Sequence, residues 1–305
     1  MNERKIYYHL PGLFEFYELY KNFLRLYREH REYFYEFCEI GSIYGAPADC
    51  LWGGGRVGFG DDNPYIVREL MREYDISARL TFSNSLLTRE DFSDYRCNEL
   101  CRIFSDSPGP EGQKTENGII IYSKDLLDYI SRKYPAFYYV SSTTKVITDF
   151  NDFTDELHDS SYRFVVPDFR LNKSLDKFNK LTNSEKDKVE FLVNECCDWN
   201  CRDRKECYDN VSRKSLGLDC TDHICKSKNA SRGYRFSEAM KNPGFISVKD
   251  IVNIYQPMGF SHFKIEGRSL GSAMVLEFLL YYMVKPECQL LVREELYLDS
   301  SLDLW

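Results

Sequence analysis

Six of the eleven cysteines in this chain lie in one segment, Cys196–Cys225. Cys197 and Cys201 have three residues between them, a spacing that lets two thiolates meet one inorganic centre. Thiolates select zinc, copper(I) or iron–sulfur clusters. Zinc sites more often use tight Cys-x2-Cys pairs, whereas irregular, widely spaced ligands suit an iron–sulfur cluster better. The segment therefore predicts a 4Fe–4S cluster, with zinc as the alternative. The five candidates for its four ligands are Cys197, Cys201, Cys207, Cys220 and Cys225.

A plainer interpretation is that these cysteines are scattered buried thiols, since free cysteine packs well in a core. The residues around them argue against it, because they are charged: Asp198, Arg202, Asp203, Arg204, Lys205 and Glu206. The other five cysteines lie mostly in helix-like or strand-like stretches and are expected in the core. They are Cys38, Cys50, Cys97, Cys101 and Cys288.

Polar residues stand where several strand-like runs end, and in a parallel barrel the chemistry lies at those ends. A carboxylate there could act as acid or base when burial tunes it, and an arginine could grip a carboxylate through two parallel hydrogen bonds. The predicted catalytic residues are Glu39, Asp168, Glu195, Glu266 and Arg268. The predicted substrate-binding residues are Arg56, Asn84, Ser142, Asn194 and Lys264.

The loop after the second strand-like run, Leu51–Gly60, reads LWGGGRVGFG. Consecutive glycines let the backbone approach a ligand closely and present N–H groups to an anion, which Arg56 would also attract. A flexible turn would have the same composition. The loop contains no lysine and does not match a Walker loop.

The last strand-like run can be analysed by parity, because alternate residues of a strand face opposite sides. Phe263 and Ile265 share one face and should pack under the helices. Lys264, Glu266 and Arg268 share the other face and should point into the barrel. Three charges that face a core must be paired or line a site. A purely structural ion network inside the barrel is the alternative for these residues.

The elements that must position these residues alternate along the whole chain. Strand-like runs occupy 5–10, 35–42, 78–84, 118–122, 136–141, 162–166, 188–194 and 262–266, and amphipathic runs occupy 16–30, 64–74, 91–104, 124–133, 149–159, 174–181, 248–258 and 271–284. Eight strands, each followed by a helix, predict a (β/α)8 TIM-type barrel over residues 1–305, with a cysteine-rich insertion, 196–247, after strand seven. An open doubly wound sheet is the alternative, although no Gly-x-Gly-x-x-Gly follows the first strand.

Length and composition agree with one such domain, at 305 residues and 43% hydrophobic residues. The formal net charge of −8 disfavours sequence-independent binding to nucleic acid. The chain starts without an apolar signal segment, and no run approaches the length needed to cross a membrane. We therefore expect a cytoplasmic protein that acts on a small-molecule or peptide substrate.

Three motifs resemble the collagenase-like peptidase family, U32. The Lys264-Ile265-Glu266-Gly267-Arg268 string resembles that family's Lys-x-Glu-Gly-Arg hallmark; Asn194–Arg204 and Asn84-Ser85 match in the family's order. The resemblance implies a barrel with a four-cysteine 4Fe–4S site near the strand ends. Several members act in oxygen-independent hydroxylation of quinone precursors, tRNA or ribosomal RNA, often with a partner of the same family.

The resemblance and the residues leave three hypotheses. The first is an oxygen-independent hydroxylase or related redox enzyme. The second is a peptidase or other hydrolase, although the chain has no His-Glu-x-x-His and no Gly-x-Ser-x-Gly. The third is a non-catalytic partner subunit whose cluster is structural.

Overall fold

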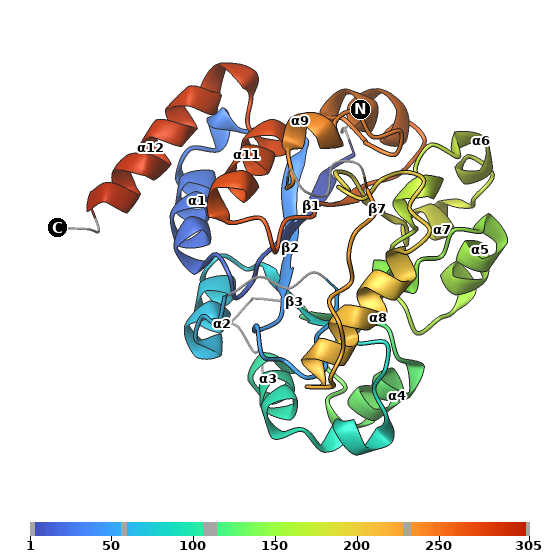
Figure 1. The fold of residues 1–305 in the computed structure, drawn as a ribbon. Helices are drawn as coiled ribbons and strands as arrows, with labels where there is room; N and C mark the ends of the chain where they lie inside the picture. The colour runs from blue at the N-terminus through green and yellow to red at the C-terminus, as the bar shows by residue number, and fades with distance from the viewer. Residues whose placement is uncertain (1–3, 56–59, 106–114, 228–232, 303–305) are drawn as a thin grey trace.

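The computed structural model describes residues 4–55, 60–105, 115–227 and 233–302. Its eight strands run parallel in the order β6-β5-β4-β3-β2-β1-β8-β7, and a bridge between Val165 and Val189 joins the two outer strands. The sheet is therefore a nearly closed barrel surrounded by helices (Figure 1), as the sequence predicted. The strands are β1 Ile6–Pro11, β2 Cys38–Gly45, β3 Ser77–Phe82, β4 Gly118–Ile121, β5 Tyr138–Ser141, β6 Phe164–Val165, β7 Glu190–Leu192 and β8 His262–Lys264.

The helices follow the strands in the predicted order. They are α1 Tyr17–Glu29, α2 Pro64–Glu73, α3 Tyr95–Ser105, α4 Lys124–Lys133, α5 Phe150–His158, α6 Leu175–Phe178, α7 Asn183–Lys186, α8 Arg204–Ser215, α9 Phe236–Ala239, α10 Val248–Asp250, α11 Ser272–Met283 and α12 Gln289–Leu302. A π-helical turn, Ile251–Tyr255, continues α10. The predicted runs did not include α7, α8, α9 and α12.

Local signals explain where several helices begin. Asn63 caps α2 by accepting a hydrogen bond from the Tyr65 N–H, and Pro64 fills the first helical position. The Thr88–Asp91 capping box is present, but it opens a 3-10 turn, Arg89–Ser93, so that α3 starts only at Tyr95. The predicted helix 91–104 is therefore divided in two.

The core outside the barrel is aromatic around β7 and β8. The Phe191 ring lies 4.9 Å from the Tyr255 ring and 5.1 Å from the Phe260 ring, both in edge-to-face geometry. Phe263 and Ile265 are fully buried in the same cluster. The parity prediction for these two residues is confirmed, and it places Lys264 on the inner face of the barrel.

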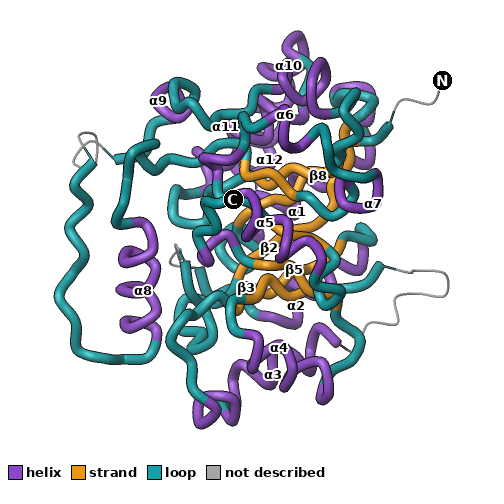
Figure 2. The backbone as a smooth tube through the Cα atoms, turned by 90° about the vertical axis from the view of Figure 1, so that its right-hand side faces the viewer, coloured by secondary structure: helices purple, strands orange, loops and turns teal. Residues whose placement is uncertain are grey.

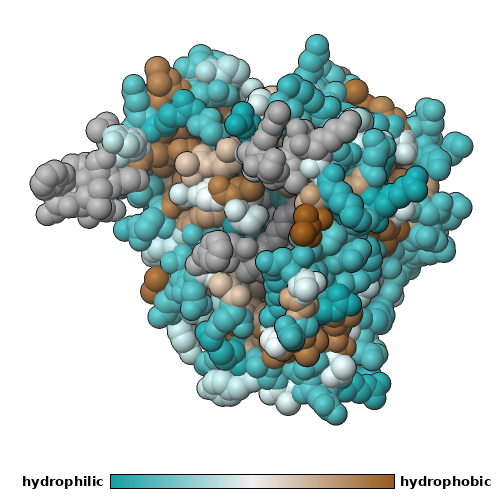
Figure 3. All heavy atoms as spheres, in the orientation of Figure 1, coloured by the Kyte–Doolittle hydropathy of each residue, from teal (hydrophilic) through white to brown (hydrophobic). Residues whose placement is uncertain are grey.

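The cysteine-rich insertion carries a helix of 12 residues, α8. In Figure 2, α8 stands apart from the strands, and the loop that follows it runs back beside it. On the face shown in Figure 3, hydrophilic side chains predominate among the coloured atoms, with small apolar patches between them. No helix in the described ranges is long and apolar enough to cross a membrane.

Candidate functional site at the barrel mouth

A pocket of about 70 Å³ lies where the strands end, with walls from the ends of β2, β3, β4, β5, β7 and β8 and from Tyr208 of α8. This is the end of a parallel barrel where loops carry chemistry. Five residues that the sequence singled out line it: Ser142, Glu195, Lys264, Glu266 and Arg268. The pocket therefore brings together half of the predicted catalytic and substrate-binding residues.

Arg268 is fully engaged with the protein. Its Nε lies 2.8 Å from a carboxylate oxygen of Glu15, and its two terminal nitrogens donate to the Thr81 hydroxyl and the Ala46 carbonyl. The sequence predicted that Arg268 grips the carboxylate of a substrate. In the structure it grips the carboxylate of Glu15 and so fixes the loop after β1 to the end of β8.

The barrel interior holds a network of buried charges centred on Glu190 of β7. Arg79 places Nη1 2.5 Å from the carboxylate and donates from Nε to the Tyr138 hydroxyl. The His9 ring nitrogen lies 3.3 Å from the same carboxylate oxygen as Arg79. Burial raises the pKa of Glu190, but the charges of Arg79 and Lys264 outweigh it, and the net pKa is lowered. Glu190 is therefore an ionised carboxylate that Arg79 already neutralises.

Lys264 extends from β8 into this network and also lines the pocket. Its Nζ lies 3.7 Å from Glu190 and 3.6 Å from the centre of the Tyr44 ring. Burial lowers the pKa of Lys264 to about 7; the nearby charges of Arg79 and Arg268 lower it as well, whereas Glu190 opposes them. The amine thus exchanges its proton near neutral pH.

A second buried cluster fixes α8 to the barrel. Arg204, the first residue of α8, lies 2.5 Å from Glu195 at the end of β7 and 3.6 Å from Asp168. Burial lowers the pKa of Arg204, but the charges of Glu195 and Cys197 outweigh it and raise the pKa above its ordinary value. Arg170 binds Asp168 through two nitrogens, at 2.6 Å and 3.0 Å.

Asp168 and two asparagines make contacts within the protein. Asp168 is fully buried between two arginines, Arg170 and Arg204. Asn84 donates to the Leu51 and Ser212 carbonyls, so that it also fastens α8. Asn194 bonds both the N–H and the carbonyl of Glu266 and holds the ends of β7 and β8 together. All three thus help to position α8 or the strand ends, and their predicted roles in catalysis or substrate binding stay predictions.

The prediction that Glu39 lies at a strand end is wrong. β2 continues to Gly45, so that Glu39 stands at its amino-terminal end, opposite the pocket. There it lies 3.1 Å from Lys5 and accepts a hydrogen bond from the Tyr27 hydroxyl. The alternation of hydrophobic residues predicted that β2 exists, but it did not predict that the strand ends at Gly45.

The glycine-rich loop lies beside the pocket, which Gly54 and Gly55 line. A Cβ on Gly54 would come within 2.5 Å of the Ser83 backbone, so that this glycine is required where two chain segments touch. Arg56, predicted to bind substrate, lies outside the described residues.

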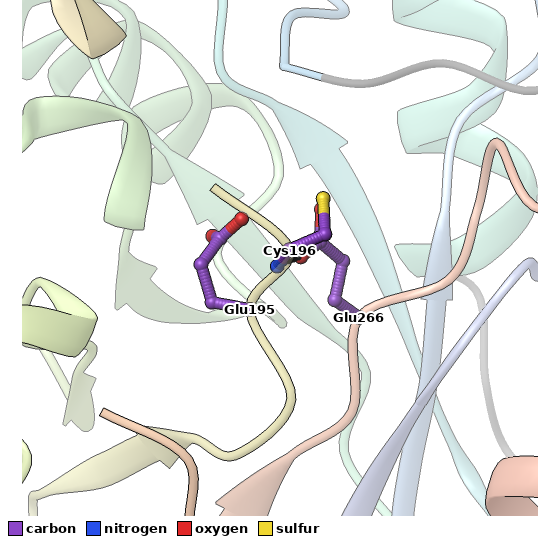
Figure 4. A group of neighbouring side chains, drawn as sticks. All are labelled: Glu195, Cys196 and Glu266. Atoms are coloured by element: carbon purple, nitrogen blue, oxygen red, sulfur yellow. Dashed lines mark hydrogen bonds between the residues drawn. The ribbon is translucent and has the colours of Figure 1, made fainter. Parts of the chain in front are cut away.

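Glu195, Cys196 and Glu266 form a small group on neighbouring strand ends (Figure 4). Within the described part of the chain, they are the one set of three potential ligand atoms that lie within 4.8 Å of one another. Glu195 is already paired with Arg204, so a divalent cation bound here would face a fixed positive charge. We therefore assign no single metal ion to this group. The thiolate ligands of a four-iron cluster lie farther apart than these three atoms. The Glu195–Cys196–Glu266 group is therefore neither evidence for nor evidence against the predicted 4Fe–4S cluster.

The five predicted cluster ligands are arranged around α8. The segment after α8 returns beside it: Asn210 donates to the Thr221 carbonyl at 2.7 Å, and Lys226 lies 2.9 Å from Asp203, just before the helix. Cys225 therefore lies level with the start of α8, where Cys201 and Cys207 stand. Cys220 remains towards the other end of the helix, where Lys214 binds Asp222.

The surroundings of the first cysteines suit an anionic iron–sulfur centre. Arg204 lies near Cys197, where a thiolate would raise the pKa of the arginine, and Arg170 donates to the Cys201 carbonyl at 3.0 Å. Cations and N–H donors around thiolate ligands stabilise the negative charge of such a cluster. Thiol donors beside these cations fit the chemistry of a 4Fe–4S cluster, which stays a prediction.

Four residues of the site escaped the sequence reasoning: Glu15, Arg79, Glu190 and Tyr208. Glu190 and Arg79 lie within predicted strands, and a charged residue inside an apolar run signals a buried ion pair. Glu15 and Tyr208 gave no such signal, because only the folded chain brings Tyr208 to the pocket and Glu15 to Arg268.

A scan against protein-family models gave no match. A search of curated proteins gave no match either. Among solved structures, the U32 peptidase Mk0906 superimposes with a TM-score of 0.50 over 88% of this chain and 95% of that chain, at 10% sequence identity. An identity this low establishes the fold alone. The chain therefore has the U32 peptidase fold.

Proposed function

We propose that this chain is an iron–sulfur protein that performs oxygen-independent hydroxylation, or a related redox modification, of a small-molecule, peptide or RNA substrate at the barrel mouth. One observation supports the proposal above all. The candidate ligands Cys197, Cys201 and Cys207 surround the start of α8, and Tyr208 on the same helix lines the pocket. The cysteines and the pocket thus share one structural element.

The cluster would be held by Cys197, Cys201, Cys207 and Cys225, and when bound it supplies single electrons. The protein's own residues bind and shield the substrate. α8 covers the pocket and would limit the entry of water. Two contacts hold the helix there: Arg204 pairs with Glu195, and Asp209 accepts a hydrogen bond from the Ser85 hydroxyl. The Glu266 carboxylate at the pocket wall can accept or return a proton.

The same proposal includes the cellular setting. A cluster of thiols that binds metal persists in a reducing compartment, so we place the protein in the cytoplasm. A second protein of the same family, as the sequence resemblance implies, would be the partner that completes the activity.

The test is anaerobic purification with measurement of iron, acid-labile sulfide and visible absorbance. We expect about four iron atoms per chain, as a 4Fe–4S cluster requires. C197A, C201A, C207A and C225A should each lose most of the iron. C220A is the matched control and should retain it, because Cys220 lies towards the far end of α8.

Other outcomes would replace the proposal. Zinc in stoichiometric amount, without iron, would remove the redox function. Peptide cleavage that survives substitution of the cysteines would establish a hydrolase instead. If iron chelation unfolds the protein and no pairing with a related protein gives activity, the cluster is structural.

A further inference from the structure

Lys264 is a buried amine at the wall of the pocket that makes no hydrogen bond within the described residues. The residue is 4% exposed, and its Nζ has no hydrogen-bond partner among the residues that the structure describes. The nearest carboxylate oxygen, on Glu190, is 3.7 Å away, beyond hydrogen-bond range. If the amine were protonated here, its N–H groups would be buried without hydrogen-bond acceptors, which costs free energy.

The other cations of the barrel have closer partners than Lys264 has. Glu190 is neutralised by Arg79 at 2.5 Å. Arg268, four residues along the chain, uses all three of its nitrogens on Glu15, Thr81 and Ala46. Lys264 instead faces the second oxygen of Glu190 at 3.7 Å and, within the described ranges, makes no hydrogen bond that a ligand would have to break.

Burial and two neighbouring cations, Arg79 of β3 and Arg268 beyond β8, favour the neutral amine of Lys264. His262 stays neutral because burial lowers its pKa to about 4. The Glu190 carboxylate and the face of the Tyr44 ring favour the charged form, and the net pKa of Lys264 is still lowered. A lysine desolvated beside other cations is an activated nucleophile.

We infer that Lys264 condenses with the carbonyl carbon of a small aldehyde or ketone bound in the pocket. The amine nitrogen forms a bond to the carbonyl carbon, and the carbon–oxygen bond breaks. Both amine protons leave with the carbonyl oxygen as water, which yields a neutral imine without any oxidant or reductant. The inference rests on the pocket of the proposed function but not on the iron.

The pocket offers space and polar groups for such a ligand. Its volume of about 70 Å³ suits a small carbonyl compound. The Thr143 hydroxyl is buried in the pocket wall and, within the described chain, has no hydrogen-bond partner. A hydroxyl in that position can donate to a carbonyl oxygen before the attack. An anionic ligand would instead need a charged ammonium, which the neighbouring arginines disfavour.

The test is reductive trapping with propanal and cyanoborohydride at neutral pH, followed by peptide mass spectrometry. We expect one propyl group on Lys264, formed at least tenfold faster than on the exposed Lys249. K186R is the matched control, since Lys186 is also buried but lies away from the pocket. It should leave the label unchanged, whereas K264R and K264M should abolish it while circular dichroism shows a folded protein.

Labelling that spreads over exposed lysines without preference for Lys264 would overturn the inference. The same trapping on C197A separates this inference from the proposed function. A label that persists without iron supports the imine independently of the cluster. Intact iron in the wild-type protein with no label on Lys264 leaves the cluster proposal standing and removes the imine.

Discussion

Glu195 and Arg204 form an almost wholly buried ion pair, with Nη2 2.5 Å from Oε2. The pair joins the end of β7 to the first residue of α8, so that a helix from the insertion becomes part of the pocket wall. Buried charges of this kind are costly to separate, because each needs the other in a medium of low polarity. The position of α8 over the barrel mouth therefore depends on this ion pair.

Replacing Arg204 should release α8. R204M leaves the carboxylates of Glu195 and Asp168 buried without their cation, and we expect the free energy of unfolding to fall by about 3–5 kcal/mol. R202A, at the neighbouring exposed arginine, should change it by less than about 0.5 kcal/mol. Urea unfolding of both variants measures the difference. Equal stability of R204M and wild type would show that the pair does not hold the helix.

Asn84 should also hold α8 in place, through its bond to Ser212. N84A removes its bonds to the Leu51 and Ser212 carbonyls, and loss of such buried bonds costs about 1–3 kcal/mol. Hydrogen exchange should become faster in α8 and stay unchanged in α5. N151A, an exposed asparagine on α5, is the control. Unchanged exchange in α8 would instead return Asn84 to the substrate-binding residues.

Lys264 should make stability depend on pH. Its pKa is about 7 in the folded chain and about 10.4 unfolded, so that the unfolded chain binds more protons between these values. The free energy of unfolding should therefore rise with pH from pH 7 upwards, by at most about 1.4 kcal/mol per pH unit, and the full penalty applies below pH 7.

The K264M variant removes the pH dependence that Lys264 contributes to stability. It retains the other titratable groups nearby, including Glu190, His262 and Tyr44. Urea unfolding of wild type and K264M from pH 6 to pH 9 measures it. The advantage of K264M should be largest at pH 6 and should shrink as the pH rises. Parallel curves for the two proteins would show that Lys264 keeps an ordinary pKa.

Glu190 should be the most sensitive carboxylate of the barrel interior. E190Q leaves Arg79 charged and unpaired within the barrel, and we expect a loss of about 3–5 kcal/mol. E116Q, which breaks the exposed pair of Glu116 with Arg163, should cost less than about 1 kcal/mol. Thermal unfolding of the two variants compares them. A similar small effect of both would contradict a central role for Glu190.

The barrel was predictable because its signals are local. Period-two and helical alternation, with caps such as Asn63, give the order and type of most elements within a few residues. Parity placed Phe263 in the outer core and Lys264 on the inner face. α8 was not predictable in this way, because it is polar around most of its surface and is held by buried ion pairs instead of an apolar face.

The sequence by itself determined the element order, the residues at the strand ends and the clustering of the cysteines. Only the tertiary structure decided which of these residues meet. Arg268 finds Glu15 across the whole chain, Arg204 finds Glu195 and Asp168, and Lys264 is left without a hydrogen-bond partner among the described residues. The physical reason is that charge pairing in a buried space depends on which side chains are nearest in three dimensions, and spacing along the chain does not specify that.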